Sequence, residues 1–198
     1  MTSLQRPLTR LEWGFGLRWV LATSVGWVVG FAACETLRAI AEFLAHPPTD
    51  GAVIGIFIGI AQWLILKGRI HRAGWWILAT IIGFGLGKAV GDAVAQAVTG
   101  ALGFGLDGAV IGSSLGVAQW LVLRRHVAQA SWWMLASSVA WAVGWSVIRI
   151  IDETAGGPGG MAYVIGATGA AAAGAITGAT LIWLLRRRSA SGAPSRAP

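Results

Sequence analysis

Six long apolar blocks divide the chain, and their length limits the folds that it can adopt. A helix needs about 20 apolar residues to cross the hydrocarbon core of a bilayer. The blocks lie at residues 17–44, 51–66, 75–98, 101–123, 132–151 and 161–185. Only 12% of the residues are charged, which is about half the share found in soluble domains. Because the blocks also lack the alternation of a membrane-spanning strand, we expect an all-α integral membrane protein with six transmembrane helices.

Basic residues indicate how the chain crosses the membrane. In a six-helix arrangement, twelve of the fifteen basic residues fall on one side, and seven of the eight acidic residues fall elsewhere. The twelve are Arg6, Arg10, Arg18, Lys67, Arg69, Arg72, Arg124, Arg125, Arg186, Arg187, Arg188 and Arg196. Short loops rich in Lys and Arg stay in the cytoplasm. We therefore expect a protein of the inner (plasma) membrane whose N- and C-termini are both cytoplasmic.

A repeat with a spacing of 57 residues organises the blocks. Residues 51–80 and 108–137 align without a gap and are identical at 16 of 30 positions. At the same spacing, Trp19, Trp76 and Trp133 correspond in the first, third and fifth blocks. The last block departs from the pattern, because an insertion shifts it by six residues and an isoleucine replaces a repeated glutamine. Such self-similarity predicts a repeat architecture: three helical hairpins of one orientation, arranged as a pseudo-threefold bundle.

The repeats set the expected domain boundaries. We expect a cytoplasmic or interfacial N-terminal segment, a six-helix transmembrane domain and a disordered cytoplasmic tail, at residues 1–16, 17–186 and 187–198. The tail is rich in Ser, Pro and Gly, a composition that cannot form an apolar core. Within the transmembrane domain, the three repeats cover about 17–66, 75–123 and 132–186.

The repeated motif has the form G-x-x-x-G-x-x-Q-W-L-x-L followed by Lys or Arg and then by W-W-x-L-A. In this form it resembles the repeats of uncharacterised multi-pass membrane proteins found in bacteria. The likeness covers most of residues 18–186 and is weak in the last helix. No activity is assigned to that family, so the resemblance implies the topology and carries over no functional residue.

Glycines recur every four residues in the second and fourth blocks. They are Gly51, Gly55, Gly59, Gly108, Gly112 and Gly116, the spacing of a glycine zipper. Small residues at this interval let helix backbones approach closely. Gln62 and Gln119 continue the same faces, and we expect each to form a hydrogen bond across a helix seam. The alternative is that the two glutamines line a ligand site or a pathway.

Tryptophans cluster within a few residues of the basic segments. Eight of them are Trp19, Trp63, Trp75, Trp76, Trp120, Trp132, Trp133 and Trp183. Indole rings concentrate at the headgroup boundary, so we interpret these residues as an interfacial belt. The alternative interpretation is a box for a pigment or another aromatic ligand. Asp50 and Asp107 directly precede the repeated segment GAVIG, and we expect them to cap the N-termini of their helices.

Charged residues occur toward the outer ends of the first, third and fifth blocks. They are Glu35, Arg38, Lys88, Asp92, Arg149 and Asp152. Residues three or four apart share a helix face, so each block presents one polar stripe. One interpretation is an ion-paired structural layer with side chains that extend toward water. The other is a vestibule where the three stripes converge, because ionisable residues within membranes often mark functional sites.

The sequence offers no recognisable catalytic or metal-binding group. No histidine lies inside an apolar block, which argues against a bis-histidine haem within the membrane. The single cysteine, Cys34, excludes a disulfide framework and a cysteine metal cluster. Cys34 also ends the stretch FAAC, which resembles a bacterial lipoprotein cleavage site, but the repeat requires this helix. We therefore expect no enzyme, no cofactor, no metal and no binding of nucleic acid.

Three hypotheses about function follow, in order of preference. The first is a non-enzymatic accessory or partner-binding bundle, whose partners are the lipid bilayer and other membrane proteins or a second copy. The second is a small channel or transporter with a path along the repeat axis near Lys88 and Asp92, and the third is an intramembrane enzyme. Trp27, Phe84 and Trp141 occupy corresponding positions. Their rings plug the bundle if they meet on the axis, whereas a path requires them to face lipid.

Overall fold

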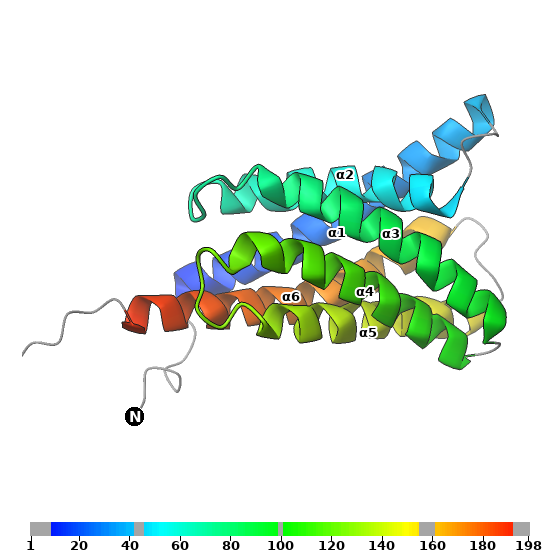
Figure 1. The fold of residues 1–198 in the computed structure, drawn as a ribbon. Helices are drawn as coiled ribbons and strands as arrows, with labels where there is room; N and C mark the ends of the chain where they lie inside the picture. Colours follow the sequence, from blue (N-terminus) through cyan, green and yellow to red (C-terminus); the bar gives the residue numbers. More distant parts are fainter. Residues whose placement is uncertain (1–8, 42–45, 99–100, 155–160, 192–198) are drawn as a thin grey trace, which may run out of the picture.

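Six long helices make up the described part of the chain. The computed structural model describes residues 9–41, 46–98, 101–154 and 161–191. The helices are α1 (Arg10–Ile40), α2 (Pro47–Leu66), α3 (Trp75–Ala97), α4 (Ala101–Leu123), α5 (Trp132–Thr154) and α6 (Ala162–Ser191) (Figure 1). All six are long and apolar enough to cross a membrane. The predicted all-α class with six candidate membrane spans is therefore confirmed.

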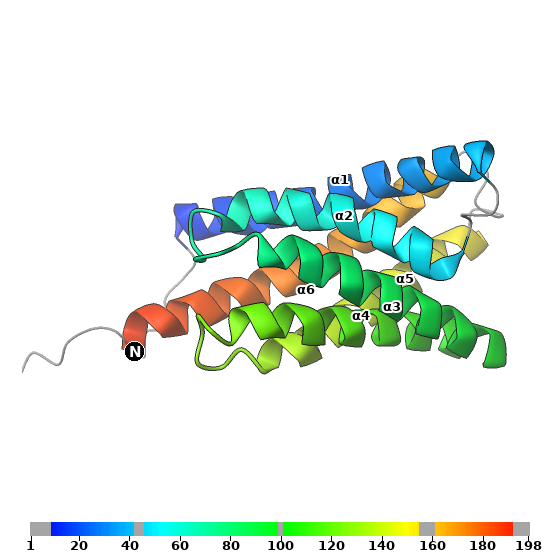
Figure 2. The same cartoon turned by 45° about the horizontal axis from the view of Figure 1, so that its top comes forward.

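The helices form a closed ring. Each helix packs against its neighbours in the sequence, and α6 packs against α1 to complete the ring (Figure 2). Short connections favour this order, because they leave consecutive helices antiparallel and adjacent. The start of α1, the end of α6 and the two loops at residues 67–74 and 124–131 lie at one end, which we call the basic end (Figure 1). The opposite end is the far end.

The outer limits of the helical region differ from those expected. Helix α1 begins at Arg10, because Thr9 and Glu12 form a capping box in which Thr9 Oγ1 accepts from the Glu12 amide at 3.3 Å. Residues 10–16 therefore continue the first helix and do not form a separate segment. Helix α6 runs to Ser191, so residues 187–191 are helical where a disordered tail was expected. Residues 1–8 and 192–198 lie outside the described part of the chain.

The two predicted aspartate caps are wrong. Helix α2 begins at Pro47. Proline is tolerated in the first turn, because an N–H there has no carbonyl acceptor within the helix and its loss costs no helical hydrogen bond. Asp50 consequently lies inside the first turn of α2. Helix α4 begins six residues before Asp107, which is buried within the helix. The apolar residues ahead of Asp107 continue the helix, and nothing in the repeated motif marked that earlier start.

Bare glycine faces let neighbouring backbones touch. A methyl group added at Gly55 of α2 would lie 2.9 Å from the Thr80 carbonyl oxygen of α3. At Gly112 of α4, it would lie 2.8 Å from the Cα atom of Ser138 in α5. Both distances are below ordinary van der Waals contact, so any side chain at these positions would push the helices apart. The close approach places the polar side chains described below within hydrogen-bonding reach of one another.

Tryptophan side chains fill the ring toward its basic end. Trp19, Trp76 and Trp133 are at most 1% exposed, and their rings meet edge to face at centroid distances of 5.6–6.3 Å. The predicted interfacial position is therefore wrong for these three. Their sequence neighbours Trp75 and Trp132 are 58% and 53% exposed, as a belt requires. Consecutive helical residues point about 100° apart, so one member of each Trp-Trp pair faces the interior and the other faces outward.

A second apolar cluster fills the ring nearer the far end. Trp27, Phe84 and Trp141 are all buried in it. The rings of Phe84 and Trp141 meet edge to face with centroids 5.0 Å apart, and Trp27 stacks on Phe31 at the same distance. The three rings thus occupy the interior of the bundle and do not face its outer surface.

We predict that Gly55→Ala destabilises the protein by about 1–3 kcal/mol, the usual range for overpacking a tight contact. The added methyl group would meet the Thr80 carbonyl and separate α2 from α3. The measurement is the free energy of unfolding in detergent by titration with a denaturing detergent. Gly14→Ala is the matched control, because a methyl group there would have no atom within 4 Å. Equal stability of the two variants would contradict the described seam.

Candidate functional site

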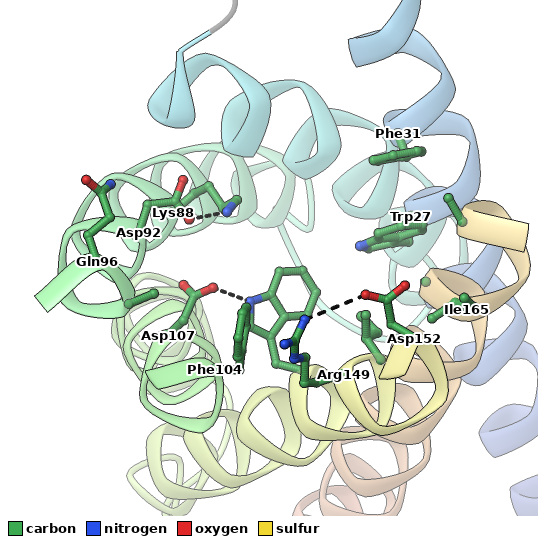
Figure 3. A pocket seen from close by; sticks show the side chains of 15 residues that line it. Trp27, Phe31, Lys88, Asp92, Gln96, Phe104, Asp107, Arg149, Asp152 and Ile165 are labelled. Atoms are coloured by element: carbon green, nitrogen blue, oxygen red, sulfur yellow. Dashed lines mark hydrogen bonds and ion pairs between the residues drawn. The ribbon is translucent and has the colours of Figure 1, made fainter. Parts of the chain in front are cut away.

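A cavity of about 540 Å³ lies inside the ring at its far end (Figure 3). It is lined by side chains from α1, α3, α4, α5 and α6. Its size falls within the range of pockets that bind small molecules, about 300–1,000 Å³. The cavity is therefore the candidate binding site against which the predicted polar residues are compared.

Four of the six residues of the predicted charged layer line this far-end cavity. Lys88 and Asp92 form an ion pair along α3, and Arg149 and Asp152 lie across from them on α5 (Figure 3). Gln96, one turn beyond Asp92, also lines the wall. Two of the three predicted stripes thus come together around one space.

The third stripe lies elsewhere. Arg38 pairs with Glu35 on its own helix and with Asp50 on α2, so this cluster joins α1 to α2. Neither Glu35 nor Arg38 lines the far-end cavity. The convergence of all three stripes, which one of the two interpretations required, is not found.

Arg149 is held by acids and by an aromatic ring. Its Nε atom lies 2.8 Å from Glu153 Oε1, and a terminal nitrogen lies 3.7 Å from Asp152 Oδ2. Its guanidinium also lies over the Phe104 ring, 4.5 Å from the centroid, an arrangement that adds a cation–π attraction. One oxygen of Asp152, Oδ1, is buried without a hydrogen-bond partner.

Asp107, which we expected to cap a helix, lines the far-end cavity. Its Oδ2 atom accepts a hydrogen bond from Trp145 Nε1 (Figure 3). Its Oδ1 atom is buried without a partner and lies against Gly91, at the place where any side chain on that residue would stand. The glycine therefore makes room for a carboxylate inside the α3–α4 seam. The only available signal was an acidic residue at the outer end of an apolar block.

Trp27 contributes a further unpaired polar group to the cavity wall. Its side chain is 6% exposed, and Nε1 has no hydrogen-bond partner. The six-membered part of the indole packs on Gly166, and the nitrogen points toward the middle of the far-end cavity (Figure 3). A buried N–H without an acceptor is costly, so this donor would gain from a bound acceptor.

The lining has more acidic than basic side chains. Lys88 and Arg149 face the carboxyl groups of Asp92, Asp107 and Asp152. Aromatic rings form much of the remaining wall. Among the described residues, no three His, Cys, Asp or Glu side chains are grouped so as to hold a metal ion. The chemistry offered is thus hydrogen bonding and charge complementarity toward a small polar molecule.

The two predicted seam glutamines lie deep in the ring, away from the far-end cavity. Gln62 accepts a hydrogen bond from Trp76 Nε1 at 2.9 Å and donates to Thr23 Oγ1 at 3.1 Å. It therefore ties α2 to both α3 and α1. Thr23 passes its own hydrogen to the Trp19 carbonyl at 2.9 Å, which leaves its oxygen free to accept.

Gln119 makes the same contacts one step around the ring. It accepts from Trp133 Nε1 at 3.0 Å and donates to Thr80 Oγ1 at 3.0 Å, and so ties α4 to α5 and α3. Thr80 in turn donates to the Trp76 carbonyl at 2.7 Å. The threonines could have been found from the sequence, because each follows its tryptophan by four residues.

The series of bonds stops at α6. Trp19 Nε1 donates to Thr177 Oγ1 at 3.1 Å, which ties α1 to α6. Thr177 then donates to its own helix, at the Ala173 carbonyl, and does not reach Ser137 of α5. Ser137 Oγ is buried without a partner. A threonine side chain is shorter than that of glutamine, which explains the gap.

Comparison with known proteins adds no identity to this geometry. No protein family, curated protein or solved structure matches the chain.

We predict that Gln119→Leu destabilises the protein by about 1–2 kcal/mol, because it leaves the Trp133 N–H buried without an acceptor. A double-mutant cycle with Trp133→Phe, which removes that N–H, measures the coupling. The loss in the double variant should be smaller than the sum of the two single losses. Additive losses, measured as unfolding free energies in detergent, would mean that the hydrogen bond contributes nothing.

Proposed function

We propose that the protein is a non-enzymatic membrane protein, a partner-binding bundle with a packed interior. The observation that carries this proposal is the filling of the ring by aromatic side chains. Trp19, Trp76 and Trp133 meet inside the basic half. Phe84 and Trp141 meet further along. The two aromatic layers lie one after the other along the axis and block a path through the bundle. They therefore favour a closed scaffold over a channel.

The proposed architecture is three hairpins related by a pseudo-threefold axis. Its support is the recurrence of contacts at the spacing of the sequence repeat. The Gln62 contacts and the Gln119 contacts are alike in partners and in length. In this proposal the last hairpin is the divergent copy, because α6 supplies Thr177 where the others supply glutamine.

The proposed orientation places the basic end in the cytoplasm. Cytoplasmic loops carry an excess of Lys and Arg, and the basic end holds both such loops and both ends of the helical region (Figure 1). The far-end cavity then opens toward the outer side of the membrane. In that position a small polar molecule or the segment of a partner protein can reach it from outside the cell.

We predict opposite labelling of two single-cysteine variants in intact cells. Both carry Cys34→Ser to remove the native thiol. Gly68→Cys lies in a loop of the basic end, where an added side chain meets no atom within 4 Å. Met161→Cys lies at the start of α6 at the far end, at a residue that is 52% exposed. A membrane-impermeant maleimide should label Met161→Cys directly and Gly68→Cys only after lysis. The reverse result would invert the proposed topology.

A small transporter is the second candidate, and the far-end cavity favours it. The unpaired Trp27 Nε1 and the ion pair of Lys88 and Asp92 would be suitable for holding a solute at the far end of a path. In this alternative the aromatic layers must separate in another conformation, because alternating access exposes one site to each side in turn.

We predict that proteoliposomes containing the protein show no more flux of small solutes than empty liposomes. Lys88→Ala and Asp92→Ala should leave this background unchanged, because the rings beneath them block passage. Arg38→Ala is the matched control, since Arg38 is charged and lies near the same membrane boundary but does not line the cavity. Flux above background that disappears in Lys88→Ala and persists in Arg38→Ala would replace the scaffold with the transporter.

A further inference from the structure

A second cavity, of about 640 Å³, lies on the outside of the ring between α3 and α4 at the basic end. We call it the α3–α4 groove. Its floor and walls are apolar: Trp75, Leu78, Ala79, Ile82, Ala118, Leu121 and Val122. Several of these side chains face outward, and Leu78 and Leu121 are 44% and 45% exposed. If the six candidate spans cross a membrane, a groove on this outer face would lie against the acyl chains of the bilayer.

Basic side chains close the groove where it reaches the loops. They are His71 and Arg72, from the loop before α3, and Arg125 and His126, from the loop after α4. Both arginines are exposed, and neither belongs to an ion pair among the described residues. The acid described at this end, Glu12, is already held by Arg186. Arg72 and Arg125 therefore place two cations at the mouth of the groove with no acidic partner among the described residues.

The other arginines of the same loops are differently placed. Arg69 lies over the Phe15 ring, 4.5 Å from its centroid, and Arg124 lies over the Trp120 ring at 5.0 Å. These two cover aromatic faces and do not line the groove. Two guanidinium groups of the basic end are thus placed at one cavity, and two nearby ones are not.

The seam between α5 and α6 shows what a filled position looks like at this end. There the rings of Trp132 and Trp183 meet edge to face, with centroids 6.4 Å apart. Arg187 lies over Trp183 at 4.1 Å and also donates a 2.5 Å hydrogen bond to Gln129. These side chains contact one another and fill that part of the seam, whereas those of the α3–α4 groove leave space.

We propose that the α3–α4 groove binds a phospholipid with an anionic headgroup. The phosphate lies between Arg72 and Arg125, and an acyl chain lies along Leu78, Ile82 and Leu121. Arginine forks suit phosphate oxygens because they donate paired hydrogen bonds. Basic pockets between helices at the cytoplasmic boundary are suited to acidic lipids. The exposed Trp75 beside them marks the level of the headgroups.

The arginines and the apolar floor together favour an anionic phospholipid over other ligands. A soluble anion would use the arginines but not the long apolar floor. A lipid without net charge would use the floor but leave two cations uncompensated. The proposal requires the chain to span a membrane, and it is independent of what the far-end cavity binds.

The test is native mass spectrometry of the full chain in detergent with added phosphatidylglycerol or phosphatidylcholine of the same acyl composition. The wild type should retain phosphatidylglycerol in preference. Arg72→Gln with Arg125→Gln should weaken that lipid by about fivefold for each guanidinium lost. The matched control is Arg69→Gln with Arg124→Gln, which removes the same charge from the same loops and should retain the preference.

Two further variants separate loss of binding from loss of fold. Arg72 has a left-handed backbone, with φ of 56°, so Arg72→Gly removes the guanidinium at a position where glycine is conformationally favoured. It should fold at least as stably as the wild type and still bind phosphatidylglycerol about fivefold more weakly. Ala118→Phe should fill the groove and exclude the acyl chain with both arginines present.

Three results would overturn the proposal. Equal losses in the two arginine pairs would indicate only diffuse attraction to the basic end. Full displacement of the lipid by glycerol 3-phosphate would indicate a soluble-anion site. Equal retention of the two lipids by the wild type would remove the headgroup selectivity. None of these results depends on the flux or labelling experiments, so failure here is distinguishable from failure of the proposed function.

Discussion

The hydrogen bonds of buried indoles govern how this ring of helices is assembled. Inside a bilayer an indole N–H has no water to bind, so a buried tryptophan is stabilised by an acceptor on a neighbouring helix. Gln62 and Gln119 supply that acceptor and use their amide nitrogen to reach a threonine on the helix beyond. Each glutamine thus fixes three helices at once. The geometry works only because glycines beside it bring the backbones close.

Dense packing and open space divide the molecule along its axis. Tryptophan rings fill the basic half. Their indole N–H groups bond to glutamine and threonine side chains. Toward the far end the aromatic filling gives way to charged side chains from three helices, and these cannot pack as tightly because each must keep a partner of opposite sign. A cavity with unsatisfied polar atoms is the physical result.

The sequence predicted the helices well because a long apolar block has few alternatives in a chain with so little charge. It also indicated that Gln62 and Gln119 face helix seams, since they share a face with spaced glycines. It could not tell which tryptophan of each adjacent pair turns inward, because both are equally apolar. The sequence also could not show that Arg38 lies apart from the charges that line the cavity. The repeat defines equivalent positions but not the partners of each side chain, and Arg38 pairs with Asp50 on the next helix.

The short side chain of Thr177 affects how firmly the helices of the ring are joined. At the level of Trp19, Trp76 and Trp133, which we call the tryptophan level, side-chain hydrogen bonds join α5 to α4, α4 to α3, α3 to α2, α2 to α1 and α1 to α6. Between α6 and α5 no such bond is present among the described residues at this level, and the Ser137 hydroxyl has no partner. Packing alone therefore holds these two helices together there, so at the tryptophan level this seam offers the least polar resistance to separation.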